Sequence, residues 1–185
     1  ACSATPLSVG LKVFSSTPYL TNGRAVPEPA CRVIEFALTC SDVVDGNLFV
    51  PASVKSIADY AFSSCSALTS VTFEADSTLE TIGEGAFSGS GLATIAVPAF
   101  VKSIANSAFS SCSALTSVTF EADSALETIG YGAFQRSGLT TIAVPASVKS
   151  IANSAFASCS ALTSVEFSCS DHVLTMSASA FDNSP

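Results

Sequence analysis

A repeat with a period of 47 residues is the feature that most constrains the fold of this chain. The segment SSCSALTSVTF spans Ser63 to Phe73 and Ser110 to Phe120, and ASCSALTSVEF spans Ala157 to Phe167. The cysteine of each copy therefore recurs every 47 residues. A fixed period of this length is typical of repeat proteins, in which each unit stacks on its neighbours.

Each period holds two related units, which we interpret as successive coils. The 23-residue units span Pro51 to Phe73, Pro98 to Phe120 and Pro145 to Phe167, and the 24-residue units span Glu74 to Val97 and Glu121 to Val144. A sixth unit begins at Ser168 and ends after Phe181. We therefore expect a stack of about six coils.

Alignment of the units places large apolar residues in columns. The phenylalanine column comprises Phe62, Phe87, Phe109, Phe134, Phe156 and Phe181, and an aliphatic column comprises Ile57, Ile82, Ile104, Ile129, Ile151 and Met176. Burial of one such side chain contributes about 1.5–3 kcal/mol, but a single coil cannot bury its own apolar side. The columns therefore predict a core of stacked ladders.

Each unit also contains a strand pattern. Between Leu68 and Phe73, the inward residues Val71 and Phe73 alternate with the outward residues Ser70 and Thr72. Stacked copies of this segment would form a parallel sheet with neighbouring strands about 4.8 Å apart.

The pattern Ile-x-x-x-Ala-Phe-x-x-Cys-x-x-Leu-x-x-Ile-x-Ile-Pro matches Ile57 to Pro98 over two units. In these residues the chain resembles the BspA-like, or Treponema-type, leucine-rich repeats, and the resemblance extends from Leu48 to Phe181. It departs in every second unit, where Ser90 and Ser137 replace the cysteine and one residue is missing. The resemblance implies a right-handed coil stack with a parallel sheet on the concave face and short 3-10 or irregular turns on the other wall. It also implies a cell-surface or secreted protein engaged in adhesion and protein binding.

Residues 1–47 lack the columns, and we predict that they form an N-terminal cap on a single solenoid domain in residues 48–185. Ile34, Phe36 and Leu38 lie at alternate positions, which indicates a strand over the first coil. A solenoid needs such a cover, because its open end would expose apolar core and unpaired strand edges.

The cysteines fall into two sets. Cys65, Cys112 and Cys159 share a column on alternate coils, about 10 Å apart, which is too far for disulfides between them. We interpret them as small buried apolar residues. Outside the columns, Cys31 and Cys40 form the best candidate disulfide. No Cys-x-x-Cys or histidine spacing indicates a zinc site.

A column of alternating charge comprises Lys55, Glu80, Lys102, Glu127 and Lys149, so that each lysine should face a glutamate one coil away. We interpret this column chiefly as a control of register, because a slip by one coil would place like charges together. A binding stripe is the alternative interpretation.

Residues with catalytic or metal-binding potential are few. His172 is the only histidine and follows Asp171, as in some catalytic triads, but the abundant serines offer no distinct partner. We favour a loop histidine. Glu74 and Asp76 recur one period later, and we favour a solvated acidic loop over a calcium site. We therefore expect no catalysis, no metal and no cofactor.

Composition narrows the partners. The formal net charge is −8 and only 12% of residues are charged, which argues against nucleic acid and against an anionic membrane surface. No apolar run approaches the eighteen or so residues of a spanning helix. The chain begins at Ala1, as in a mature protein after removal of a targeting segment or in a fragment of a longer protein, and we favour the first. We expect secretion or display at the cell surface, with an organelle lumen, in a membrane-associated complex, as the alternative.

Two sets of exposed positions are candidates for contacts with a partner. The outward strand positions are small and nearly uncharged, and they include Ser70, Thr72, Thr94, Ser117, Thr119, Thr141 and Glu166. The positions where the repeat breaks its own pattern are Tyr60, Glu84, Tyr131, Gln135 and Arg136. We favour the second set, because a few aromatic and charged anchors dominate binding energy.

The family resemblance favours a non-catalytic protein-interaction or adhesion module that binds another protein or a larger protein complex, whereas the plain outward face of the sheet favours a structural subunit. A structural subunit, docked as a scaffold on a larger assembly such as a membrane-embedded one, is the alternative. A third hypothesis is that the serine and threonine rows bind a regular lattice, such as a glycan polymer or ice.

Overall fold

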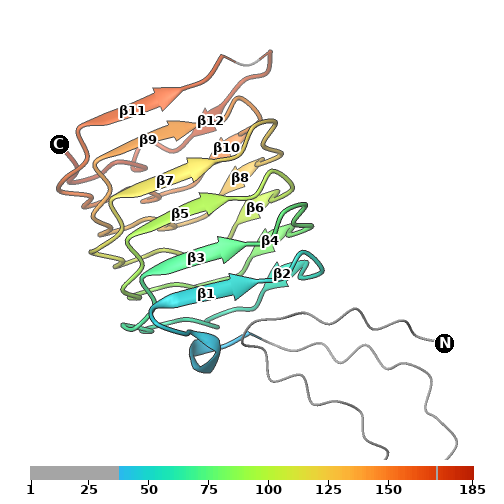
Figure 1. Ribbon diagram of the computed structural model, residues 1–185. Coiled ribbons are helices and arrows are strands. Elements are labelled where there is room, and N and C mark those ends of the chain that lie inside the picture. Colours follow the sequence, from blue (N-terminus) through green and yellow to red (C-terminus); the bar gives the residue numbers. More distant parts are fainter. Residues whose placement is uncertain (1–37, 170) are drawn as a thin grey trace, which may run out of the picture. The chain divides into compact units, whose positions relative to one another are not determined.

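Residues 38–169 and 171–185 are described by a computed structural model, in which they wind into a stack of coils (Figure 1). Each coil contributes one long and one short strand. The long strands are β1 (Asn47–Val50), β3 (Ser70–Phe73), β5 (Thr94–Val97), β7 (Ser117–Phe120), β9 (Thr141–Val144) and β11 (Ser164–Phe167). The short strands are β2 (Ser56–Ile57), β4 (Thr81–Ile82), β6 (Ser103–Ile104), β8 (Thr128–Ile129), β10 (Ser150–Ile151) and β12 (Thr175–Met176).

The two sets of strands form two parallel, six-stranded sheets, with the long strands in the order β1-β3-β5-β7-β9-β11 and the short strands in the order β2-β4-β6-β8-β10-β12. Consecutive coils are therefore neighbours in both sheets. The register aligns the predicted columns, since Ile95 lies opposite Val118 and Ile104 lies opposite Ile129. The predicted repeat solenoid with a parallel sheet is confirmed.

The short-strand sheet differs from the wall of 3-10 or irregular turns that the family resemblance implies. Each of its strands has two residues, and the second residue belongs to the aliphatic column, as Ile82 and Ile104 do. Both of these side chains are fully buried. Two residues are too few to display the alternation of a strand, so the pattern alone does not reveal this sheet.

A continuous stack of phenylalanine rings runs through the core from Phe62 to Phe181. Neighbouring ring centroids lie 5.0–5.3 Å apart, and the ring planes are within 2–10° of parallel. This distance is close to the spacing of hydrogen-bonded strands, so each coil adds one ring to the stack. The rings from Phe62 to Phe156 are fully buried.

A column of alternating cysteine and serine lies three residues after the rings. Cys112 Sγ donates to the carbonyl oxygen of Phe87 at 2.9 Å, and Cys159 Sγ donates to the equivalent carbonyl one coil back at 3.1 Å. Both thiols are buried, as the sequence predicts, and burial raises the pKa of each. Ser184 continues the column, because its Oγ donates to the carbonyl of Phe156 at 2.7 Å.

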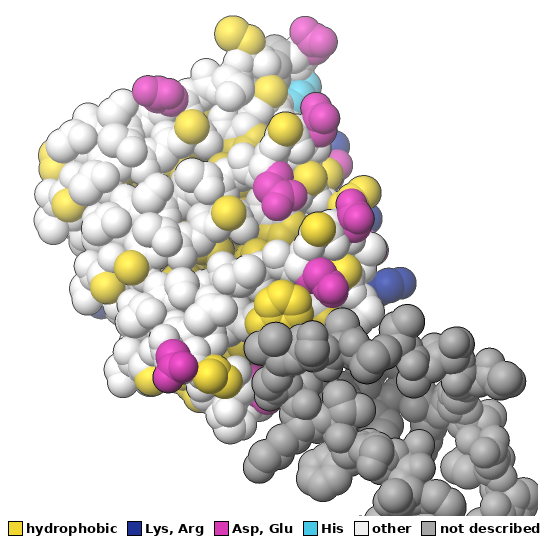
Figure 2. Space-filling model, viewed as in Figure 1, with side chains coloured by type: hydrophobic (Ala, Val, Ile, Leu, Met, Phe, Trp, Pro, Cys, Tyr) yellow, Lys and Arg dark blue, Asp and Glu magenta, His cyan; other side chains and the backbone are white. Residues whose placement is uncertain are grey.

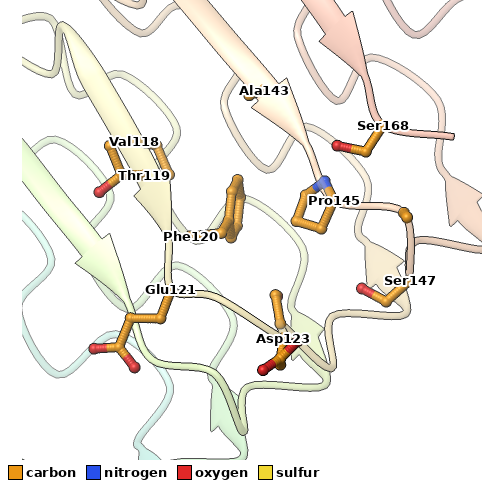
Figure 3. A pocket seen from close by; sticks show the side chains of 11 residues that line it. Val118, Thr119, Phe120, Glu121, Asp123, Ala143, Pro145, Ser147 and Ser168 are labelled. Atoms are coloured by element: carbon orange, nitrogen blue, oxygen red, sulfur yellow. The ribbon is translucent and has the colours of Figure 1, made fainter.

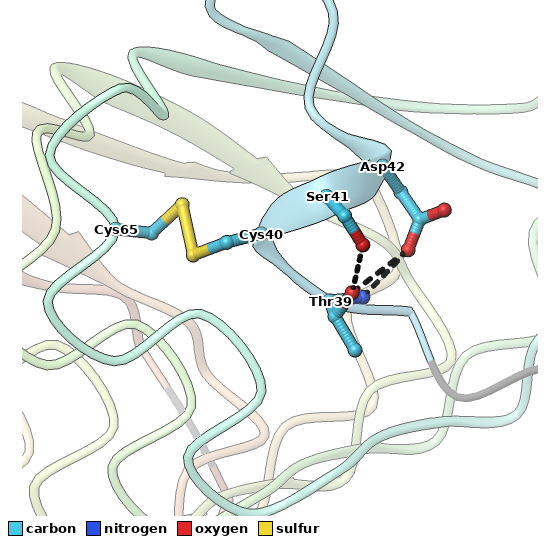
Figure 4. Close-up of a disulfide and its surroundings, with 5 residues drawn as sticks. All are labelled: Thr39, Cys40, Ser41, Asp42 and Cys65. Atoms are coloured by element: carbon cyan, nitrogen blue, oxygen red, sulfur yellow. Dashed lines mark hydrogen bonds between the residues drawn. A yellow bond between two sulfur atoms is a disulfide. The ribbon is translucent and has the colours of Figure 1, made fainter.

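The first member of this column, Cys65, forms a disulfide with Cys40, with Cα atoms 5.9 Å apart (Figure 4). The predicted pairing of Cys40 with Cys31 is therefore wrong, and Cys65, although buried as predicted, is bonded to Cys40. Cys31 itself lies outside the described residues. Cys40 precedes Cys65 by 25 residues, which is also the interval from Cys65 to Ser90. Cys40 thus holds the column position of a preceding coil, and the bridge closes the column there.

The described residues before β1 contact the first coil. The 3-10 helix η1 (Cys40–Asp42) follows Thr39, whose backbone N–H donates to Asp42 Oδ2 at 2.8 Å (Figure 4). Leu38 and Val43 pack against the core. Residues 1–37, including the strand predicted around Ile34 and Phe36, lie outside the described residues, so the cap in residues 1–47 and its boundary with residues 48–185 stay predictions.

Candidate interaction surface

The outward face of the long-strand sheet is flat and rich in hydroxyl groups, and Figure 2 shows it as a mostly white surface. The predicted outward residues on it are Ser70, Thr72, Thr94, Ser117, Thr119, Thr141 and Glu166. Ser70 Oγ and Thr72 Oγ1 donate to Asn47 Oδ1 at 2.9 and 3.1 Å. Two of the hydroxyls on this face are thus engaged within the sheet itself. Phe49 of β1 is 45% exposed.

The turns that carry the phenylalanine column form a second surface. We call residues 58–69, 83–93, 105–116, 130–140 and 152–163 the phenylalanine turns. On the first two of them, Tyr60 Oη donates to Glu84 Oε1 at 2.6 Å, and this hydrogen bond raises the pKa of the phenol. Glu84 N–H in turn donates to Asp59 Oδ1 at 2.7 Å. The structure therefore brings Tyr60 and Glu84 together, while 58% of Tyr60 remains exposed.

Gly85 makes room for the Tyr60 ring. Its φ of +56° lies in the left-handed region, and a Cβ at this position would lie 2.5 Å from Tyr60 Cε1. Ser107 and Ser154 adopt a similar φ at the equivalent position, so the close approach of the ring is what a side chain at Gly85 would disturb, and Gly85 thereby positions the Tyr60–Glu84 pair.

Tyr131, Gln135 and Arg136 lie together on the turn 130–140. Tyr131 N–H donates to Asn106 Oδ1 at 2.9 Å, and 53% of the residue is exposed. Arg136 is exposed with a φ of +56°, a conformation that few residues other than glycine adopt. Gln135 is half-buried. This group is separated from Tyr60 and Glu84 by the turn 105–116, so the five predicted residues form two groups on one set of turns.

The column of alternating charge is organised into pairs. Lys102 Nζ lies 2.7 Å from Glu80 Oε2, and Lys149 Nζ lies 2.8 Å from Glu127 Oε1. Hydrogen bonds from the two lysines lower the pKa of Glu80 and of Glu127, and the bond to Glu80 raises the pKa of Lys102. The predicted facing of lysine and glutamate is confirmed for both pairs.

A cavity of about 530 Å³ opens beside the turns that follow β7, β9 and β11 (Figure 3). Phe120, Glu121, Asp123 and Ser168 are among the residues that line it. Glu121 Oε2 accepts a hydrogen bond from Ala99 N–H at 3.1 Å. The carboxylate of Glu121 thus stabilises the turn of the preceding coil, which fits the interpretation of a solvated acidic loop.

The residues considered for catalysis and metal binding are His172 and the acidic side chains. His172 Nε2 donates to the carbonyl oxygen of Val148 at 3.0 Å, which fits a loop histidine. Within residues 38–169 and 171–185, no three His, Cys, Asp or Glu side chains gather closely enough to hold a metal ion.

Phe100 is an exposed aromatic residue that is missing from the predicted sites. Its exposed fraction is 59%, and it borders a groove with Lys55, Glu80 and Lys102. The repeat contains the signal, because the sequence PAFVK at this position replaces the PASVK of the first and fifth coils.

Comparison with known proteins agrees with this geometry. The profile of the BspA type leucine-rich repeat region matches residues 45–163 and 119–185. The chain belongs to the BspA-type leucine-rich repeat family. No helix in the described part of this BspA-type chain has the length and apolarity needed to cross a bilayer. Comparison with curated proteins gives no match.

Several solved structures are similar to this BspA-type chain. The leucine-rich repeat protein of T. pallidum is 31% identical with a TM-score of 0.59, over 65% of this chain and 57% of that one. The pneumococcal vaccine antigen PcpA is 28% identical with a TM-score of 0.59, over 73% and 31% of the two chains. A leucine-rich repeat protein from Bacteroides ovatus is 26% identical with a TM-score of 0.52, over 68% and 39%. The chain thus spans between 31% and 57% of these three structures.

Proposed function

We propose that this BspA-type chain is a non-catalytic module for protein interaction or adhesion, and that its partner contacts the phenylalanine turns. The observation that carries this proposal is the distribution of differences within the repeat. The two 24-residue coils differ at five positions, and four of these lie in the phenylalanine turns. The core columns of the same coils are identical.

The residues introduced by these differences suit a protein contact. Tyr131 and Arg136 replace a glutamate and a glycine of the earlier coil, and both are exposed on one turn. Tyrosine and arginine are enriched among the residues that dominate binding energy at interfaces. The hydroxyl-rich sheet face, in contrast, offers small side chains that supply few anchors.

We also propose that the module works in an oxidising compartment, secreted or at the cell surface. Disulfides persist outside the cytosol, and the Cys40–Cys65 bridge supports such a location. The similarity to a pneumococcal vaccine antigen supports it further, because an antigen must be accessible to antibodies.

Site-specific crosslinking tests the proposed surface. A photoreactive phenylalanine analogue is placed at Tyr131, and in a matched variant at Thr119 on the hydroxyl-rich face, and each protein is irradiated with surface extract from the source organism. We expect a discrete crosslinked protein from position 131 that is absent from position 119. Equal products from both positions, or products from position 119 alone, would contradict the proposal. Sedimentation of the product with a large complex would instead favour the scaffold subunit.

A further inference from the structure

Phe100 is the position at which the third coil departs from both coils of its own type. The segment Pro98 to Phe120 differs from Pro51 to Phe73 at three positions and from Pro145 to Phe167 at three, and Phe100 alone is common to both comparisons. The other two coils have Ser53 and Ser147 there. Serine is thus the residue that the repeat itself supports at this position. An aromatic ring that is 59% exposed gains little from the core, so the change from serine at this position does not serve the fold.

The ring borders a groove that crosses three consecutive coils. The groove has a volume of about 260 Å³ and is lined by Lys55, Thr78, Glu80, Phe100 and Lys102. Lys102 is held by Glu80 at 2.7 Å. Lys55 is exposed, and in the described part of the chain no carboxylate oxygen lies within 4.0 Å of its Nζ. The groove therefore combines an exposed aromatic ring with an ammonium group available to a ligand.

The charge of the chain selects the kind of ligand. The formal net charge is −8, while the lysines of the described residues, Lys55, Lys102 and Lys149, all lie in one column. Lys102 and Lys149 are each paired with a glutamate of the same column, so Lys55 is the lysine of this column that is left to attract a carboxylate, while most of the net-negative molecule repels acidic partners. One available ammonium group is too little to offset a nucleic-acid backbone, but it matches a single carboxylate.

We propose that this Phe100 groove binds an acidic peptide segment, in which one carboxylate contacts Lys55 and a neighbouring apolar side chain lies against Phe100. Charge complementarity fixes the first contact, and the exposed ring supplies the apolar anchor of the second. This surface is distinct from the phenylalanine turns, so the inference goes beyond the proposed function and stands independently of it.

A titration followed by NMR tests the inference with ¹⁵N-labelled protein. The probe is a capped peptide of sequence GDLDFDG, and its uncharged counterpart is GNLNFNG. We expect the acidic peptide to shift the amide signals of residues 53–56, 78–81 and 99–103, with an affinity that falls as salt is added. We expect the uncharged peptide to bind at least tenfold more weakly.

Matched variants sharpen the test. Phe100→Ser restores the residue of the first and fifth coils and should fold normally. Its affinity for the acidic peptide should fall at least tenfold. Lys55→Gln should lower the affinity for the acidic peptide and make it less dependent on salt. Lys149→Gln, in the same column but outside the groove, should leave the affinity unchanged. Tyr131→Asn should also leave it unchanged, which separates this site from the proposed function. Absence of binding, equal affinity for both peptides, or undiminished affinity in Phe100→Ser would overturn the proposal.

Discussion

The phenylalanine ladder inside the solenoid and the phenylalanine turns outside it follow opposite rules. Inside, every coil presents the same ring, and the five rings from Phe62 to Phe156 are fully buried. Outside, residues only two or three positions from those rings differ from coil to coil, as Tyr131 and Arg136 do. The same short segments therefore contain both the least and the most variable positions.

Stacking explains the difference. A buried ring contacts the rings of the coils on both sides, so a change in one coil is felt by two neighbours. An exposed side chain at a turn does not need to pack against both neighbouring coils. The backbone hydrogen bonds of the turn form whatever that side chain is. Inner positions thus specify the fold, and outer positions are available for recognition.

The largest effect is expected from an inner substitution at the middle of the ladder. Phe109→Ala should lower the free energy of unfolding by about 3–5 kcal/mol, because it leaves a cavity between Phe87 and Phe134. Unfolding in denaturant measures this loss of free energy. Phe100→Ser is the matched outer control, expected to change stability by less than about 0.5 kcal/mol. Comparable losses in the two variants would refute the distinction between inside and outside.

Loss of the Cys40–Cys65 disulfide should rank next. The double variant Cys40→Ser, Cys65→Ser should lose about 2–4 kcal/mol, because the bridge closes a loop of 25 residues in the unfolded chain. Hydrogen exchange should locate the loss in β1 and β3, since coils contact only their neighbours. A uniform rise of exchange across all coils would show that the bridge does not act locally.

The cysteine column distinguishes a hydrogen-bonding role from a purely apolar one. Cys112→Ser should cost less than about 1 kcal/mol, because serine already occupies this column at Ser90 and keeps a donor for the carbonyl of Phe87. Cys112→Val should cost more, about 0.5–1.5 kcal/mol, because the carbonyl of Phe87 loses one of its two donors and keeps only the N–H of Ser90. Calorimetric unfolding of both variants would decide, and a reversed order would mean that apolar volume matters more than the bond.

The smallest effect is expected from the exposed charge pairs, and it should depend on pH. Glu80 has a pKa lowered from 4.5, so its stabilising contribution is complete above pH 4.5 and is lost as pH falls through the folded-state pKa. Lys102 has a pKa raised from 10.5, so its contribution is complete below pH 10.5 and is lost as pH rises through the folded-state pKa.

The melting temperature of Glu80→Gln should therefore differ from that of the parent chain between these limits and converge with it in acid. Gln is a matched replacement because it keeps the shape of the side chain. A difference that persists unchanged at low pH would show that the pair acts through packing rather than charge.

Much of the fold could be predicted because a period of 47 residues aligns the core columns without reference to structure. The short strands could not be predicted, since two residues such as Ser103 and Ile104 show no alternation. The disulfide could have been predicted, because the interval of 25 residues from Cys40 to Cys65 continues the cysteine and serine column. Cys40 was not assigned to that column because its segment lacks the other columns. The Tyr60–Glu84 hydrogen bond could not be predicted, because it depends on the space that Gly85 leaves.

The most direct test of the account combines the outer substitutions in one protein. Each exposed residue that departs from the repeat is replaced by the residue that another coil has at the equivalent position. The substitutions are Tyr60→Ser, Tyr131→Asn, Gln135→Ser and Arg136→Ser. The measurement is capture of the partner identified by crosslinking, beside the thermal unfolding curve of the same protein. The account predicts an unchanged unfolding curve and loss of capture. Retained capture, or a fall in stability comparable to that of Phe109→Ala, would contradict it.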